Sequence, residues 1–353
     1  MKSKEFGPKI EEEETKEKEP ELRLKIFFST HKNERDFGAL KKEVEGCDVY
    51  IPELSNYGPE FLKALRDISF GKLTPGGFIL QYEAEHLYKQ ISDYIRGLFK
   101  TIYNSKKPIY LIDIPEEHEL VFKSKEAERF NDCAYDYFLR GDFAAALANQ
   151  RIFIKAYGKT QSEREKYIFD NIKKLKPEII KDYPYLKNQE EIKILVSIGI
   201  GHTGLYHRLK GEKIPAQRQF SFLPFISSIA TELIRGEQFF PGKDIDNRKL
   251  AQSLIEMPVE LALHENKNIN DSFEIMKIGR YLASKFNEKD VEKFSKMLGE
   301  KYSEIMNTSV FALPGEPKWQ QTLEPFLEKF GVKFPETREE VKEIIRKVEK
   351  RGK

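Results

Sequence analysis

The sequence predicts an α/β protein: a mainly parallel sheet covered by helices on both faces, with a helical C-terminal extension. Two observations carry this prediction. Up to about residue 215, short apolar runs typical of strands alternate with stretches whose apolar residues recur at helical spacing. Beyond Pro215 the pattern is helical almost throughout. Strands that alternate with helices favour a parallel sheet with both faces covered.

Four apolar runs are the expected strands of this sheet. Each is bounded by charged residues, glycine or proline, which commonly end a strand. The expected strands span residues 22–29, 48–53, 108–113 and 192–199. The helices expected between them span 34–46, 59–68, 82–104, 124–139, 143–157 and 161–174. The stretch "TPGG" at 74–77 is expected to interrupt the chain before the long helical pattern.

The chain is expected to have three parts. Residues 1–20 mix Glu and Lys with almost nothing to bury, which predicts a disordered charged leader. Residues 21–215 form the α/β core with helical insertions, and residues 216–353 form a mostly helical part. Its expected helices span 225–235, 248–265, 270–285, 288–306 and 336–350. The last helix carries one apolar stripe that we expect to dock on the protein, formed by Val341, Ile344, Ile345 and Val348.

Composition narrows the partners and the compartment. Lys and Arg number 60 against 58 Asp and Glu, so no overall field attracts nucleic acid or an anionic membrane. Cys47 and Cys133 lack the spacing of a metal or redox motif, which favours a reducing compartment. The N-terminus has no apolar signal region, and no run approaches the ~20 apolar residues of a membrane span. We therefore expect a cytoplasmic protein with neither nucleic acid nor a membrane as a partner.

The segment "VSIGIGHTGLYHRL", from Val196 to Leu209, matches the dinucleotide-binding pattern G-x-G-x-x-G at Gly199, Gly201 and Gly204. That motif also needs a full helix and an acidic residue about 20 positions on. Here the helix is barely two turns long, and "QFSFLPF" at that position contains no acid. We therefore expect the glycines to form a tight turn that presents His202 at the end of a strand. An NAD(P)-dependent oxidoreductase remains a lesser alternative.

Two further polar residues follow expected strands. His31 comes just after the first strand, and Glu53 ends the second. In a parallel sheet both would reach the same edge as His202, where ligands of open α/β sheets usually bind. Two imidazoles and a carboxylate could bind a divalent metal such as zinc, manganese or cobalt, or act as general base and partner. A histidine at a strand end can also be an ordinary hydrogen-bonded structural residue.

Four segments in order carry a family resemblance: "FFSTH…DVYIPEL", "KPIYLIDIP", "SEREKYIFDNI" and "VSIGIGHTGLYHRLKG". Together they resemble the superfamily of TraB-type pheromone-shutdown proteins, Tiki-type metalloproteases, ChaN-like haem-binding proteins and erythromycin esterases. There a G-x-x-H turn follows the first strand and a Glu ends the second. An Arg opens a later helix, and a second such turn follows the last core strand. Over roughly residues 22–211 the resemblance implies a site of His31, Glu53, Arg164 and His202.

The resemblance implies hydrolysis of an ester or peptide bond, with Arg164 stabilising developing negative charge. Asp113, beyond the third expected strand, would hold an imidazole in one tautomer. One departure favours a different function. Phe28 stands where the family usually has glycine, and a bulky residue there can narrow the approach to His31. The alternative to the hydrolase is a protein without turnover that binds haem, a peptide or another small molecule in the same cleft.

Overall fold

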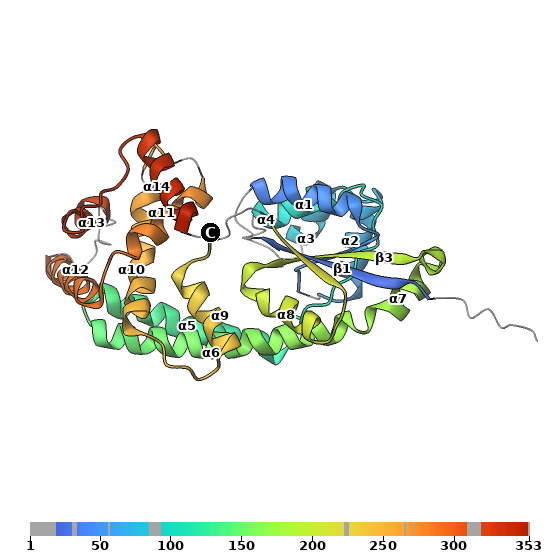
Figure 1. Ribbon diagram of the computed structural model, residues 1–353, viewed down its shortest axis with the longest axis horizontal. Helices are drawn as coiled ribbons and strands as arrows, with labels where there is room; N and C mark the ends of the chain where they lie inside the picture. The colour runs from blue at the N-terminus through green and yellow to red at the C-terminus, as the bar shows by residue number, and fades with distance from the viewer. Residues whose placement is uncertain are drawn as a thin grey trace, which may run out of the picture.

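The computed structural model describes residues 19–29, 34–55, 57–84, 93–221, 226–264, 266–269, 271–308 and 319–351. Almost all of the expected leader, and His31, lie outside these residues. Figure 1 shows a sheet with helices above and below it, joined to a helical region by two long helices that run beneath both. The predicted fold class, a parallel α/β sheet followed by a helical region, is confirmed.

The sheet has four parallel strands in the order β2-β3-β1-β4. Ser29, the last residue of β1, lies opposite Gly199, the last residue of β3. Pro52, the last residue of β2, lies opposite Ser197. The carboxyl ends of these three strands therefore meet at one edge of the sheet. The strands are β1 (Glu21–Ser29), β2 (Val49–Pro52), β3 (Glu191–Gly199) and β4 (Ala216–Phe220).

Both faces of the sheet are buried, because alternate residues of each strand enter different hydrophobic clusters. Ile26 and Ile194 pack toward α6–α8, whereas Phe27 and Leu195 pack toward α1–α4. The helices on the face with Phe27 are α1 (Glu34–Gly46), α2 (Pro59–Ser69), α3 (Pro75–Ala84) and α4 (Asp93–Ile102). The helices on the face with Ile26 are the second half of α6 (Phe143–Ile172), α7 (Leu175–Asp182) and α8 (Thr203–Gly211), with the short 3-10 turns η1 (Pro184–Asn188) and η2 (Ile200–His202).

The third expected strand, 108–113, is wrong. Only Ile109 forms a strand-like bridge, with Tyr50. Tyr50 makes both hydrogen bonds of this bridge, with Pro108 and Tyr110, and the Ile109 carbonyl accepts a hydrogen bond from Arg66 Nε at 3.0 Å. The fourth strand is instead β4, "AQRQF", which pairs with β1 and lies within the part expected to be helical. The sheet therefore continues past residue 215.

The stretch "TPGG" does not interrupt the chain, because α3 begins at Pro75. Thr74 Oγ1 accepts a hydrogen bond from the backbone N–H of Gly77 at 3.0 Å. This bond satisfies one of the free N–H groups in the first turn, as a helix-capping residue does. Part of the long helix expected over 82–104 lies outside the described residues, and α4 covers its end.

The two helices expected over 143–157 and 161–174 are a single helix, α6, of 30 residues. At 1.5 Å per residue this helix is about 45 Å long. Gly158, in the expected break, does not end it. A Cβ at this position would lie 2.8 Å from Cβ of Glu237 and 3.1 Å from the carbonyl oxygen of Ile234, both on helix α9 (Ile229–Phe239). The glycine therefore allows α9 to approach α6 closely.

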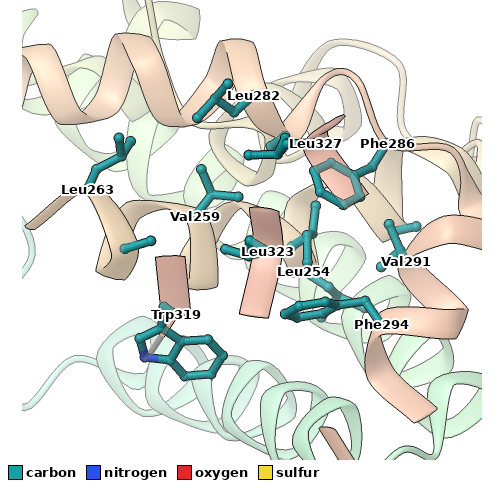
Figure 2. Packing of buried hydrophobic residues seen from close by; sticks show 14 of the residues in the cluster. Leu254, Val259, Leu263, Leu282, Phe286, Val291, Phe294, Trp319, Leu323 and Leu327 are labelled. Carbon is teal, nitrogen blue, oxygen red and sulfur yellow. The ribbon is translucent and has the colours of Figure 1, made fainter. Parts of the chain in front are cut away.

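The C-terminal helices surround α10, whose Leu254 and Val259 are fully buried. Figure 2 shows these residues packed against Phe286, Phe294 and Trp319. Besides α5 (Glu119–Leu139), the helices of this region are α9 (Ile229–Phe239), α10 (Asn247–His264), α11 (Ser272–Ala283), α12 (Glu288–Thr308), α13 (Trp319–Glu328) and α14 (Arg338–Arg351). Helix α13 was not expected from the sequence.

The expected docking stripe of the last helix reaches this core. Val341 is fully buried, and Ile344 and Ile345 pack against the same cluster. No helix in the described part of the chain has the length and apolar character needed to cross a membrane.

We predict that Gly158→Ala destabilises the protein by about 1–3 kcal/mol, because the added methyl group overlaps α9. Gly236→Ala is the matched control: Gly236 is also helical, but nothing lies within 4 Å of the added methyl group. This control should stabilise by up to about 1 kcal/mol through helix propensity. Denaturant unfolding measures both changes. A Gly158→Ala protein more stable than wild type would show that Gly158 is merely a weak helix former.

Candidate active site

Glu53 and His202 meet at the carboxyl edge of the sheet. Glu53 directly follows β2, and His202 ends η2, the short turn after β3. Nε2 of His202 lies 3.2 Å from Oε1 of Glu53. The imidazole is almost fully buried, with 4% of the side chain exposed, whereas 15% of the Glu53 side chain is exposed. The carboxylate is therefore the part of this pair that solvent or a ligand reaches.

Three donors surround the Glu53 carboxylate. The backbone N–H of Gly199 donates to Oε2. Arg164 Nη2 lies 3.3 Å from Oε1, the oxygen that also faces His202. A carboxylate offers about four acceptor positions, and these described donors fix its orientation. The contacts to Oε1 hold the carboxylate between two groups that carry or can carry positive charge.

Asp113 holds Arg164 in place. Nε of Arg164 donates to Oδ1 of Asp113 at 2.8 Å, and Nη2 donates to Oδ2. The carboxylate is 3% exposed and also accepts the Ile114 N–H at 2.7 Å. Burial opposes the charge on Arg164, but the Asp113 hydrogen bonds and the charges of Asp113 and Glu53 outweigh it and raise the pKa of the guanidinium. Among the described residues Asp113 therefore orients a guanidinium, and not an imidazole as expected.

Glu165, which the sequence analysis did not single out, lies on the other side of His202. Its Oε1 is 3.9 Å from Nδ1 of His202, and neither atom makes a hydrogen bond within the described structure. The Glu165 side chain is 1% exposed. Burial raises the pKa of its carboxyl, while His202, Arg208 and the N–H groups of Gly204 and Leu205 reduce the rise. The signal in the sequence was the acid directly beside Arg164 in "SEREKY".

Tyr157 is a second residue that the sequence analysis missed. It precedes Arg164 by seven positions on α6, and residues seven apart on a continuous helix share a face. Burial is the main cause of the raised pKa of its phenol, and the charges of Arg164 and Glu53 also act on it. The expected break between residues 157 and 161 concealed this relation. A continuous helix would have placed Tyr157 beside the site.

The three glycines of the G-x-G-x-x-G pattern do not form a phosphate cradle. Gly199 has φ −65° and ψ 154°, an extended conformation open to other residues, and nothing lies within 4 Å of a Cβ built at Gly201. At Gly204 a Cβ would overlap Oε2 of Glu165. Carboxylates occupy both the Gly199 N–H and the start of α8, which disfavours the oxidoreductase alternative.

The described residues supply two of the three expected metal ligands. Glu53 and His202 are close enough for one ion to contact both, since zinc lies about 2 Å from nitrogen and oxygen ligands. Within the described part of the chain no group of three His, Cys, Asp or Glu residues could hold an ion. Arg164 is ion-paired with the same Glu53 oxygen and would repel a dication there. These residues therefore fit a metal only in part.

Phe28 lies in the core. Its side chain is 0% exposed, and its ring stacks on Phe220 of β4 with 5.2 Å between ring centroids. The side chain packs with the cluster beneath the sheet, on the face covered by α6 and α8. The Phe28 ring, at a position where the superfamily that the motifs resemble usually has glycine, is thus accommodated by packing in the core.

No family model matches this chain, and neither does any curated protein or solved structure. The function is therefore inferred from the geometry of the site and from the residues that carry the resemblance.

We predict that Gly204→Ala lowers stability by about 1–3 kcal/mol, because the methyl group overlaps the buried Glu165 carboxylate. Gly201→Ala, in the same motif, meets nothing within 4 Å and should change stability by less than about 0.5 kcal/mol. Thermal and denaturant unfolding give both values. Equal effects at the two positions would contradict the close approach of Glu165 to α8.

Proposed function

We propose that this protein is a hydrolase that cleaves an ester or peptide bond at Glu53, His202 and Arg164. The observation that carries the proposal is the 3.2 Å contact between His202 Nε2 and Glu53 Oε1, with Arg164 on the same oxygen. These groups gather at the carboxyl edge of a parallel sheet, where α/β proteins usually bind their ligands. The ordered motifs that resemble the TraB, Tiki, ChaN and erythromycin esterase superfamily support the same reading.

In this proposal Glu53 accepts a proton from the attacking water. Gly199, His202 and Arg164 hold the carboxylate in one orientation, and 15% of the Glu53 side chain is exposed to solvent. The water oxygen bonds to the carbonyl carbon, the bond to the leaving group breaks, and the proton passes to the leaving group. His31, two positions after Ser29 in the sequence, is the group to which we assign that proton transfer.

Arg164 is the group proposed to stabilise the negative charge that develops on the carbonyl oxygen. Nε and Nη2 are bound to Asp113 and Glu53, while Nη1 makes no hydrogen bond to the described residues. The Arg164 side chain is 19% exposed, so a substrate can reach it. A fixed charge aimed at a developing oxyanion is worth about 3–4 kcal/mol in the transition state.

A metallohydrolase is the second candidate, because Glu53 and His202 could bind one ion together with His31. Zinc, manganese or cobalt there would supply a hydroxide at neutral pH.

We also propose that the protein acts in the cytoplasm, since neither Cys47 nor Cys133 forms a disulfide.

We predict that Glu53→Gln and His202→Ala each reduce hydrolysis by about 10²–10⁴-fold, as expected when general acid–base groups are removed. His207→Ala is the matched control, because this exposed histidine lies on α8 and contacts only the rings of Tyr206 and Phe239 among the described groups. It should keep activity within about twofold of wild type. The assay uses nitrophenyl esters, lactones and quenched peptides, with thermal melting to verify folding.

Chelation decides between the two candidates. We expect hydrolysis to survive stripping with a chelator, because Arg164 already neutralises the Glu53 carboxylate. Loss of activity on stripping, with recovery in zinc, manganese or cobalt, would establish the metallohydrolase instead. If wild type and variants are folded and inert on every substrate, the proposal gives way to a binding protein that uses the same cleft.

A further inference from the structure

A cavity of 330 Å³ lies where the turn after β3 meets the helical region. Ile200 of η2 forms one wall, and residues of α5, α9, α10 and α11 form the others. This volume lies at the lower end of the range of small-molecule sites. Figure 1 shows α9 and α10 between the sheet and the outer helices, at the level of this junction.

One buried carboxylate lines the cavity without a full set of partners. Glu256, on α10, is 4% exposed. Its Oε2 accepts the N–H of Ile229 at 2.7 Å, whereas Oε1 makes no hydrogen bond in the described structure. A buried polar atom without a partner destabilises a protein by about 1–3 kcal/mol, so such groups commonly serve a function. A ligand that donates a hydrogen bond would satisfy Oε1.

The surroundings of Glu256 favour a cationic donor. Glu260, one helical turn further along α10, also lines the cavity. None of the described lining residues is a lysine or an arginine. The nearby Arg280 is held by Glu232, at 2.5 Å, and by the Ser227 carbonyl, at 2.7 Å. The cavity is therefore acidic, and a positive charge inside it would be attracted.

The remaining walls are apolar and adaptable. Met257 and Met276 face the cavity together with Ile200 and Ile226. Methionine side chains adjust to irregular apolar shapes. A ligand suited to both kinds of wall carries a charged donor on a compact apolar body.

We propose that this cavity binds an organic ammonium ion, whose N–H groups donate to Glu256 and whose apolar part contacts Met257 and Met276. Binding itself does not depend on hydrolysis. The assignment of the cavity as a substrate subsite does rest on the proposed function. Ile200 lines the cavity, and its neighbour Gly199 holds Glu53, so an ammonium ion in the cavity would place an adjoining ester or amide near Glu53.

Proton release accompanies this binding. Burial raises the pKa of Glu256 to about 8, the Glu260 and Glu232 carboxylates add to the rise, and the Ile229 N–H and Arg280 reduce it. Tyr135 of α5 also faces these carboxylates, and burial keeps its phenol neutral by raising its pKa. A cation favours ionised Glu256, so its affinity should increase as the pH rises from 6 to 8. Because binding releases one proton, the affinity for the ammonium ion should increase by about several tens-fold between pH 6 and pH 8.

The test is calorimetric titration of the full chain with phenethylammonium, and with 2-phenylethanol as the neutral probe. We expect wild type to bind the ammonium ion at least tenfold more tightly than the alcohol at pH 8, and tens of fold more tightly at pH 8 than at pH 6. Glu256→Gln should match wild type at pH 6 and lose the increase at pH 8. Glu178→Gln, which removes an exposed charge on α7, should behave as wild type.

Met276→Trp provides a second variant, because it fills the cavity and leaves Glu256 intact. It should abolish binding while thermal melting shows a folded protein. Failure of folded wild type to bind phenethylammonium at 10 mM would overturn the proposal, as would equal binding by Glu256→Gln at pH 8. Either result leaves the hydrolysis assay of Glu53→Gln unaffected. Conversely, an inert protein that binds the ammonium ion would reject only the hydrolase.

Discussion

The continuity of α6 is the constraint on which the site depends. Its first half packs through Phe143 and Ala146 into the helical core, and its second half packs through Ile168 and Phe169 under the sheet. Because a helix of 30 residues is stiff, this double attachment fixes where Arg164 stands relative to the strand ends. Glycine at position 158 costs about 1 kcal/mol in helix propensity, yet it allows α9 to pack directly on α6.

The side chains at the sheet edge form a series of alternating acidic and basic groups from Asp113 through Arg164, Glu53 and His202 to Glu165. Asp113, His202 and Glu165 are nearly fully buried, whereas Arg164 and Glu53 are partly exposed. Burying so many ionisable groups costs more desolvation energy than packed apolar side chains would. Such a series is therefore poorly explained by stability, whereas a reactive carboxylate needs fixed groups around it.

The sequence predicts the interior of the sheet better than its edge. β1, β2 and β3 are buried on both faces and therefore appear as apolar runs. The ends of β2 and β3 then place Glu53 and His202 at the strand ends. β4 pairs only with β1 in the described sheet, and its polar "AQRQF" has no strand signal of its own. The run at 108–113 is apolar because it is buried, but it forms only a single bridge, between Ile109 and Tyr50, in the described sheet. The sequence does not predict Glu165 as a site residue, because its neighbour in the site, His202, is 37 positions away and only tertiary packing brings the two together.

The turn after β3 connects the reactive edge to the rest of the molecule. Gly199 supplies the N–H that holds Glu53, Ile200 lines the acidic cavity, and His202 faces Glu53, all within four residues. Consecutive Cα atoms are about 3.8 Å apart, so the cavity wall and the carboxylate are separated by little more than one residue. A ligand that spans this distance is the size of a small molecule or one peptide side chain. For the proposed hydrolase, the geometry of the turn therefore limits the substrate more strongly than the G-x-G-x-x-G motif does.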